Sequence, residues 1–443
     1  MSTRSSDGAG RGSVARIVAL LTSFLRSNAA IYLGGAVLSR VGAIILIPLY
    51  TRRLTPDEYG EYALAVSLLQ VLPHCASLGL TAGIARVFFA EKRLEEGTRR
   101  MGAVARGMIV IVSCSIALFA LCTYLFVHQP LFGIRRRVLM LIVLASAGTA
   151  FGMIPELYFR SSQRPRPAVA LQLTSFLSMA GFGILFVLGL GRGVDGVIEA
   201  AACSSGLMGV IALVFVHLRL PGGDNWAETK QAIPFSLALV PNVFASWIQL
   251  TADRWILTAY GATSALGTYY LAVQLLTPIS MVSSAWNDAQ APRYGELYRT
   301  HGAVAAYEAL PASYRRYALV TLVPALGILA VSPLLPIVIG PKFIGAITVM
   351  PVLGAALVVD SLYFPPTNYL FYVGRTTFIP IATVTSGIVA TTLSILVLPR
   401  FGLPGLVACR FLGSVLRATA MIVAGRIARP KGGSTLMRPP EST

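Results

Sequence analysis

The sequence predicts an all-α, polytopic integral membrane protein with about 12 transmembrane helices in two pseudo-symmetric six-helix lobes. Of its 443 residues, 55% are hydrophobic and only 12% are charged, about half the charged fraction of a soluble protein. Apolar segments long enough to cross a bilayer recur along the whole chain. Because hydrocarbon offers the backbone no hydrogen-bond partners, segments of this length are expected to be helices. A short repeat, with one copy in each half of the chain, predicts the two lobes.

The predicted helices follow one another through short connections. They cover residues 29–49, 56–82, 102–127, 138–158, 168–190, 196–218, 231–258, 266–289, 317–339, 346–372, 378–398 and 404–425. The first apolar run is too long for a signal peptide and lacks a small-residue cleavage site, so we expect it to be a retained helix. An even number of helices places both termini on the same side of the membrane.

The distribution of basic residues predicts which side that is. With a cytoplasmic N-terminus, 23 of the 36 Lys and Arg residues lie in the tails and inner connections and eight in the outer connections. This bias follows the positive-inside rule. The net charge of +18 then reflects topology and attraction to anionic lipid headgroups, and no nucleic-acid partner is expected. The predicted domains are a cytoplasmic tail (1–28), a first lobe (29–218), a cytoplasmic linker (219–230), a second lobe (231–425) and a cytoplasmic tail (426–443).

A polar interruption, LYTRRLTPDEYGEYAL, separates the first two predicted helices. Thr55 is suited to the N-cap of the second helix, Pro56 to its first position, and Glu58 completes a T-x-x-E capping box. The segment is therefore predicted to be a tight external hairpin, after which the second helix begins at once.

The repeat lies where the second and eighth predicted helices begin. Residues 59–69 read YGEYALAVSLL and residues 266–276 read LGTYYLAVQLL, with seven of eleven positions identical at an offset of 207. Six helices per lobe make the repeats parallel, an arrangement found in secondary transporters that bind substrate between their halves.

Polar residues at helical spacing form stripes on three of the predicted helices. The candidates for the lining of a polar cavity are Ser39, Ser67, Gln70, His74, Asn242, Ser246, Gln249, Gln274, Thr277 and Ser284. The alternative for any single stripe is helix–helix packing through small polar residues. Three stripes related by the repeat favour a shared water-filled cavity.

Charged residues inside the predicted spans are the candidates for substrate contacts. The cations are Arg40, Arg254, Arg410 and Arg417, and the acids that could hold a coupling cation are Asp253, Asp288 and Asp360. Charges inside a bilayer are costly and are typical of functional sites, although ion pairs that hold helices in register are the alternative. Because cations outnumber acids, an anionic substrate is favoured, and the planar fork of arginine suits phosphate.

The sequence carries no nucleotide-binding loop, nucleophile motif or metal-ligand cluster. We therefore expect neither an enzyme nor a cofactor nor a metal site.

The segments LIPLYTRRLTPDEYGEYAL and TADRWILTAYGATSALGTYYLAVQLL resemble the polysaccharide-flippase (Wzx-like) branch of the MOP transporter superfamily. The resemblance implies two lobes around a cationic cavity in the bacterial cytoplasmic membrane. It also implies alternating access that carries undecaprenyl-diphosphate-linked oligosaccharide repeat units outward for surface polysaccharides such as lipopolysaccharide or exopolysaccharide. The four arginines would contact diphosphate or acidic sugar. Membrane lipids, a polysaccharide polymerase and the export machinery are the further partners it implies.

Three alternatives remain open from the sequence. A MATE-like multidrug or cation antiporter shares the architecture but would need more acids in its cavity. The lipid II flippase branch is typically built from fourteen spans rather than twelve. A membrane glycosyltransferase or polymerase would need a sizeable external loop, whereas the outer connections here are about five to twelve residues long.

Overall fold

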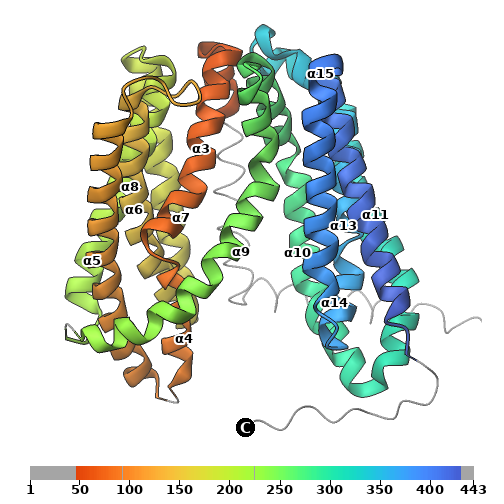
Figure 1. Cartoon of the computed structure of the whole chain (residues 1–443), viewed down its shortest axis with the longest axis horizontal. Helices are drawn as coiled ribbons and strands as arrows, with labels where there is room; N and C mark the ends of the chain where they lie inside the picture. Colours follow the sequence, from red (N-terminus) through yellow and green to blue (C-terminus); the bar gives the residue numbers. More distant parts are fainter. Residues whose placement is uncertain (1–45, 92, 224, 431–443) are drawn as a thin grey trace, which may run out of the picture. The chain divides into compact units, whose positions relative to one another are not determined.

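The computed structural model describes residues 46–91, 93–223 and 225–430, and all regular elements within them are helices. Most of the first predicted helix, with Ser39 and Arg40, lies outside the described residues. The longer elements (Figure 1) are α3 (Pro56–Ala76), α4 (Leu80–Ala90), α5 (Leu94–Phe126), α6 (Arg136–Ser161), α7 (Pro165–Gly183), α8 (Gly193–Arg219), α9 (Trp226–Ala259), α10 (Thr263–Glu308), α11 (Leu310–Val331), α13 (Gly345–Ser361), α14 (Phe364–Tyr372) and α15 (Phe378–Ile427). The short elements are η1 (Ile184–Gly189), η2 (Ser332–Leu334), α12 (Leu335–Val338) and η3 (Pro341–Phe343).

The membrane-spanning character of the chain is confirmed. In the described part, nine helical segments are long and apolar enough to cross a membrane, and α3 with α4, bent by 53°, makes a tenth. The last of these segments, α15, combines the two final predicted helices across Gly402, whose φ of 57° breaks the helix. The predicted all-α architecture with about 12 transmembrane helices therefore agrees with the structure.

Several helices differ in length from their predicted ranges. The predicted second helix bends because Leu78 and Gly79 have positive φ values of 50° and 69°, and the chain continues as α4 to Ala90. Helix α10 continues past the predicted end at 289 and reaches Glu308, with a break at Gly302, whose φ is 80°. Its extension is rich in charged and tyrosine side chains, so hydropathy does not reveal that it stays helical beyond the apolar span.

The predicted capping box at the start of α3 is confirmed. The backbone N–H of Thr55 donates to Glu58 Oε2 at 2.7 Å, and the N–H of Glu58 donates to Thr55 Oγ1 at 3.3 Å. These reciprocal bonds satisfy two backbone donors that a helix N-terminus would otherwise leave open, so α3 begins at Pro56 as the sequence predicts.

The described chain divides into two compact units. Unit 1 contains residues 65–247 and the described residues before Leu54. Its core is formed by buried apolar side chains such as Leu80, Met101, Met108 and Ile154. Helices α6 and α8 pack at close range, since a Cβ at Gly148 would lie 2.1 Å from the carbonyl oxygen of Ser205.

Unit 2 contains Leu54–Leu64 and the chain from Ile248 onward. Its core includes Tyr369, Leu370, Met421 and Tyr294. The first turns of α3 and the last part of α9 therefore belong to unit 2, while the rest of both helices belongs to unit 1. The predicted lobes, 29–218 and 231–425, follow the sequence repeat rather than these contacts, and they stay a prediction.

Within unit 2 the two copies of the repeat meet in a reciprocal contact. A Cβ at Gly267 would lie 1.9 Å from the carbonyl oxygen of Pro56, and a Cβ at Gly60 would lie 2.4 Å from the carbonyl oxygen of Thr263. Gly60 and Gly267 are equivalent by the offset of 207, and so are Pro56 and Thr263. Gly267 therefore lies against Pro56, and Gly60 lies against Thr263, the residue equivalent to Pro56 in the other copy. The same contact is made twice, as in a self-complementary two-fold interface.

Candidate functional site

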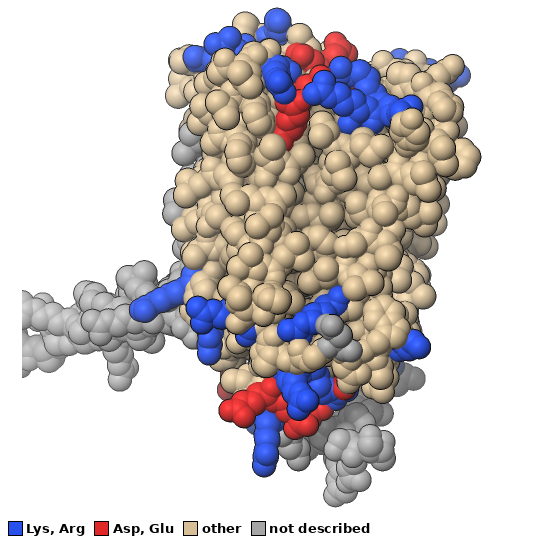
Figure 2. All heavy atoms as spheres, turned by 90° about the vertical axis from the view of Figure 1, so that its left-hand side faces the viewer, with Lys and Arg blue, Asp and Glu red and all other residues tan. Residues whose placement is uncertain are grey.

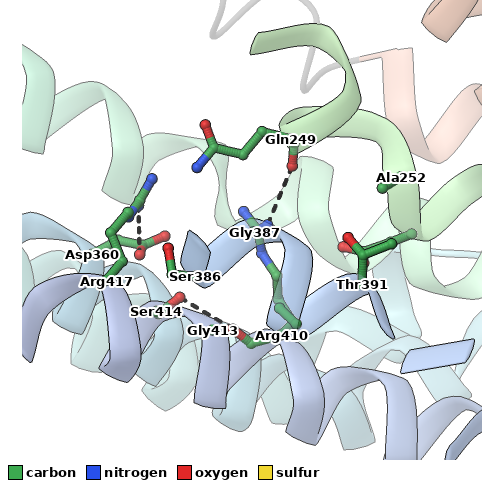
Figure 3. A pocket seen from close by; sticks show the side chains of 12 residues that line it. Gln249, Ala252, Asp360, Ser386, Gly387, Thr391, Arg410, Gly413, Ser414 and Arg417 are labelled. Carbon is green, nitrogen blue, oxygen red and sulfur yellow. Dashed lines mark hydrogen bonds and ion pairs between the residues drawn. The ribbon is translucent and has the colours of Figure 1, made fainter. Parts of the chain in front are cut away.

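A small polar pocket in unit 2 brings together several of the residues that the sequence predicted (Figure 3). Its volume is about 40 Å³, enough to hold at least one water molecule. It is lined by Gln249, Ala252 and Asp253 of α9, Asp360 of α13, and Ser386, Gly387, Ala390, Thr391, Arg410, Gly413, Ser414 and Arg417 of α15. Two acids and two arginines therefore share one site.

The spacing of α15 explains why its polar side chains gather there. Arg410, Ser414 and Arg417 are four and three residues apart, which places them on one helical face. Ser414 Oγ donates to the carbonyl oxygen of Arg410 at 3.2 Å, so the serine satisfies its hydroxyl within the helix and leaves the two guanidinium groups to the pocket.

Arg417 forms an ion pair with Asp360. Its Nη2 atom lies 2.5 Å from Asp360 Oδ1, although this contact lies outside hydrogen-bond geometry. The guanidinium also lies over the ring of Tyr363, 5.0 Å from the centroid. The two charged side chains are only 19% and 15% exposed. For Arg417, the ion pair that the sequence left as an alternative is what the structure contains.

Arg410 has weaker fixed partners. Its Nη1 atom donates to the carbonyl oxygen of Gln249 at 3.4 Å, a long hydrogen bond (Figure 3). Asp253, on the same pocket wall as Gln249, instead accepts a hydrogen bond from the Tyr269 hydroxyl at 2.6 Å. Within the described ranges no carboxylate pairs with Arg410 at ion-pair distance. Its guanidinium is therefore the pocket's candidate contact for an anionic group.

Arg254 does not line this pocket. It is 8% exposed, donates to the carbonyl oxygen of Ala63 at 3.3 Å and lies over the ring of Tyr270, 4.6 Å from the centroid. Tyr270 in turn packs against Tyr59 and Tyr62 of α3. Arg254 thus holds α9 against the first turns of α3, beside the contact between the two repeats.

The polar stripes are distributed over both units. In unit 1, Ser67 is buried, His74 is half-buried, and Gln70, Asn242 and Ser246 are exposed. In unit 2, Gln274 is half-buried and accepts a hydrogen bond from the Tyr59 hydroxyl, while Thr277, Ser284 and Asp288 are exposed. Of the predicted polar-lining residues that lie in the described ranges, Gln249 alone lines the pocket.

Sequence reasoning missed Tyr269 and Tyr363, the aromatic partners of Asp253 and Arg417, because an aromatic residue inside an apolar span carries no spacing signal. Ser386 and Thr391 were also missed. In the described ranges, no three His, Cys, Asp or Glu side chains gather closely enough to hold a metal ion.

The charge pair gives a first prediction. Asp360→Asn should destabilise the protein by on the order of 2 kcal/mol, between the ~0–1 kcal/mol of exposed pairs and the ~3–5 kcal/mol of buried ones, because it leaves Arg417 without its counter-charge. The melting temperature of the detergent-purified protein measures this. The double variant Asp360→Asn/Arg417→Gln should recover much of the loss, and a double variant as unstable as the sum of its single changes would show that the two residues do not interact.

Comparison with known proteins places the chain in a family. The sequence model of the family described as "polysaccharide biosynthesis protein" matches residues 25–297. The chain belongs to this family. No curated protein matches the chain at the sequence level.

Solved structures of other proteins share the fold of this chain. The chain is similar to a multidrug resistance MATE family transporter of the MOP superfamily in its inward-facing conformation, with 12% identity, coverage of 90% of this chain and 98% of that one, and a TM-score of 0.72. It is also similar to the lipid II flippase MurJ in an inward closed conformation, with 10% identity, 90% and 87% coverage and a TM-score of 0.69. At these identities the likeness concerns the fold alone. The chain therefore has the fold of MOP-superfamily membrane transporters and flippases.

Proposed function

We propose that this protein is a flippase that moves undecaprenyl-diphosphate-linked oligosaccharide repeat units across the bacterial cytoplasmic membrane by alternating access. Two observations together support the proposal: the chain belongs to a polysaccharide biosynthesis family, and its fold is similar to that of a lipid flippase. Polysaccharide units are assembled on lipid carriers, so a transporter-like member of such a family has a natural cargo. Both termini would be cytoplasmic, as the basic-residue bias predicts.

The pocket supports an anionic cargo. A guanidinium inside a bilayer is costly unless an opposite charge meets it, and Arg410 has no acid partner at ion-pair distance in the described chain. A phosphate oxygen would supply that charge, and the planar guanidinium can bind it with two parallel hydrogen bonds. We infer that Arg410 is the leading phosphate contact of the pocket, with Arg417 as a further candidate. Arg40, which lies outside the described residues, stays a candidate from the sequence alone.

The acids of the pocket bear on cation coupling. Asp360 is matched by Arg417 at 2.5 Å, so a coupling cation would have to displace a guanidinium there. Asp288 is exposed and lies away from the pocket lining. Asp253 has a tyrosine hydroxyl rather than a cation as its closest partner, which makes it the remaining candidate for a coupling cation.

The proposal is tested by lipid extraction from a strain that lacks this protein but keeps its glycosyltransferases. A complete sugar repeat unit on polyprenyl diphosphate should accumulate on the cytoplasmic leaflet, because assembly continues while transfer stops. Restoring the gene should clear it. Normal surface polymer without accumulation would argue against the proposed cargo.

A second candidate is a multidrug exporter, favoured by the likeness to the MATE transporter. Such pumps carry organic cations, which Arg410 would repel. Ethidium efflux separates the two functions, since a flippase should leave ethidium accumulation unchanged when it is expressed.

A further inference from the structure

One end of unit 1 carries a dense group of charged side chains. Three consecutive arginines open α6, and a fourth precedes α8, whose first turns supply two acids. The group consists of Arg135, Arg136, Arg137, Arg192, Asp195 and Glu199, and we call it the arginine cluster. In Figure 2 acidic side chains at the upper end of this face lie beside basic ones, and a broad uncharged band separates them from the charges at the lower end.

The acids of the cluster lie beneath its arginines. Glu199, 8% exposed, accepts hydrogen bonds from Arg137 Nη2 at 2.7 Å and from Arg192 Nη1 at 2.6 Å, and Asp195 pairs with Arg135. Four arginines against two carboxylates leave two positive charges. The side chains of Arg135, Arg137 and Arg192 are 52%, 68% and 48% exposed, so that excess faces outward.

The position of these arginines is unfavourable for the helix that carries them. A helix N-terminus is the positive end of the macrodipole and favours acids, yet the first turn of α6 contains no acid and begins with arginine. The ion pairs given for these arginines go to the two acids of α8, where Glu199 is shared by Arg137 and Arg192 and Asp195 pairs with Arg135. An anion from outside the protein would offset the positive charge at the start of α6.

Arg136 is the member of the cluster best placed to bind such an anion. Its guanidinium lies over the ring of Tyr124, 4.5 Å from the centroid, and no carboxylate of the described residues forms an ion pair with it. A cation–π contact of this kind holds the guanidinium in place without using its N–H groups as hydrogen-bond donors to a carboxylate. It is thus oriented without being neutralised.

Apolar side chains beside the cluster indicate what kind of anion this is. Phe126 and Phe132 are 77% and 54% exposed, and Tyr124 is 57% exposed. Aromatic side chains at a helix end suit the boundary between headgroups and acyl chains. A soluble anion would gain nothing from them, whereas a lipid would place its phosphate on the arginines and its chains on the rings.

We propose that the arginine cluster binds the phosphate group of an anionic membrane phospholipid, with Arg136 as the principal contact. This site is separate from the polar pocket of unit 2 and does not rest on the proposed flippase function. It would anchor the α6–α8 end of unit 1 to one leaflet.

The test uses the full-length protein in phosphatidylcholine nanodiscs that contain a trace of phosphatidylglycerol with a photoreactive headgroup. Cross-links should map to the segments around residues 124–137. Arg136→Gln removes one cation near the surface and should lower this labelling about fivefold, while Arg136→Lys should keep most of it. Neither change touches an ion pair, so folding should be retained.

Arg160→Gln is the matched control, because Arg160 is an ion-paired, exposed arginine at the opposite end of the same helix; it should leave labelling at the cluster unchanged. Equal labelling of wild type and Arg136→Gln, or equal labelling by photoreactive phosphatidylcholine, would overturn the proposal. Loss of labelling on addition of millimolar inorganic phosphate would replace the lipid with a soluble anion.

Discussion

Arg410→Ala should reduce transport by about 10- to 100-fold while leaving the protein folded and present in the membrane. The change removes the pocket cation that has no acid partner at ion-pair distance in the described chain, and a hydrogen bond to a charged group contributes about 1.5–3 kcal/mol. The measurement is surface polymer restored to a deletion strain, at matched protein levels determined by immunoblot. Arg410→Lys keeps the charge but loses the two parallel hydrogen bonds of the guanidinium, so its transport should lie between that of the wild type and that of Arg410→Ala.

Arg426 provides the control for this prediction. It lies exposed in the last turn of the same helix, α15, outside the pocket. Arg426→Ala should support normal polymer. If Arg410→Ala supports as much polymer as Arg426→Ala, the pocket arginine has no part in transport.

Gly267→Ala should strongly destabilise the protein, because the added methyl group would lie 1.9 Å from the carbonyl oxygen of Pro56. A backbone atom cannot rotate away, so α10 and the start of α3 would have to separate by roughly 1.5 Å to reach ordinary contact, and overpacking of this kind costs about 1–3 kcal/mol. The melting temperature in detergent is the measurement. Gly327→Ala is the matched control, since no atom lies within 4 Å of a Cβ built at this helical glycine, and it should not lower the melting temperature.

Because the contact is reciprocal, the Gly267→Ala test can be extended to a double variant. Gly60→Ala should destabilise the protein in the same way, because its methyl group would lie 2.4 Å from the carbonyl oxygen of Thr263. Once either change has forced the helices apart, the second should cost little, so the double variant should lose clearly less than the sum of the two single losses. Strict additivity would show that the two glycines do not form one contact.

The sequence was sufficient for the features that depend on local chemistry. Apolar length predicts the helices, and Thr55 with Glu58 predicts the start of α3 and the bonds formed there. The repeat identifies Gly60 and Gly267 as equivalent, although only the structure reveals that they contact each other's surroundings. Helical spacing alone predicts that Arg410 and Arg417 lie on the same face of α15.

The parts that could not be predicted depend on contacts between distant segments. Asp360 and Arg417 are far apart in the chain, and no spacing rule joins α13 to α15. Arg254 follows Asp253 directly but points to Tyr270 and Ala63, because neighbouring positions on a helix face directions about 100° apart. The bend at Gly79 depends on a positive φ that hydropathy does not register.

The central claim, that this chain moves a lipid-linked oligosaccharide, is tested most directly with the purified protein in liposomes. Polyprenyl-diphosphate-linked repeat units are incorporated in both leaflets, and a glycosidase that cannot cross the membrane is added outside. With the wild-type protein, the sugar of both leaflets should be digested, because inner-leaflet units reach the outer face. In liposomes that contain the Arg410→Ala variant, the glycosidase should digest the sugar of the inner leaflet much more slowly. Protection of half the sugar in wild-type liposomes, as in protein-free ones, would contradict the account.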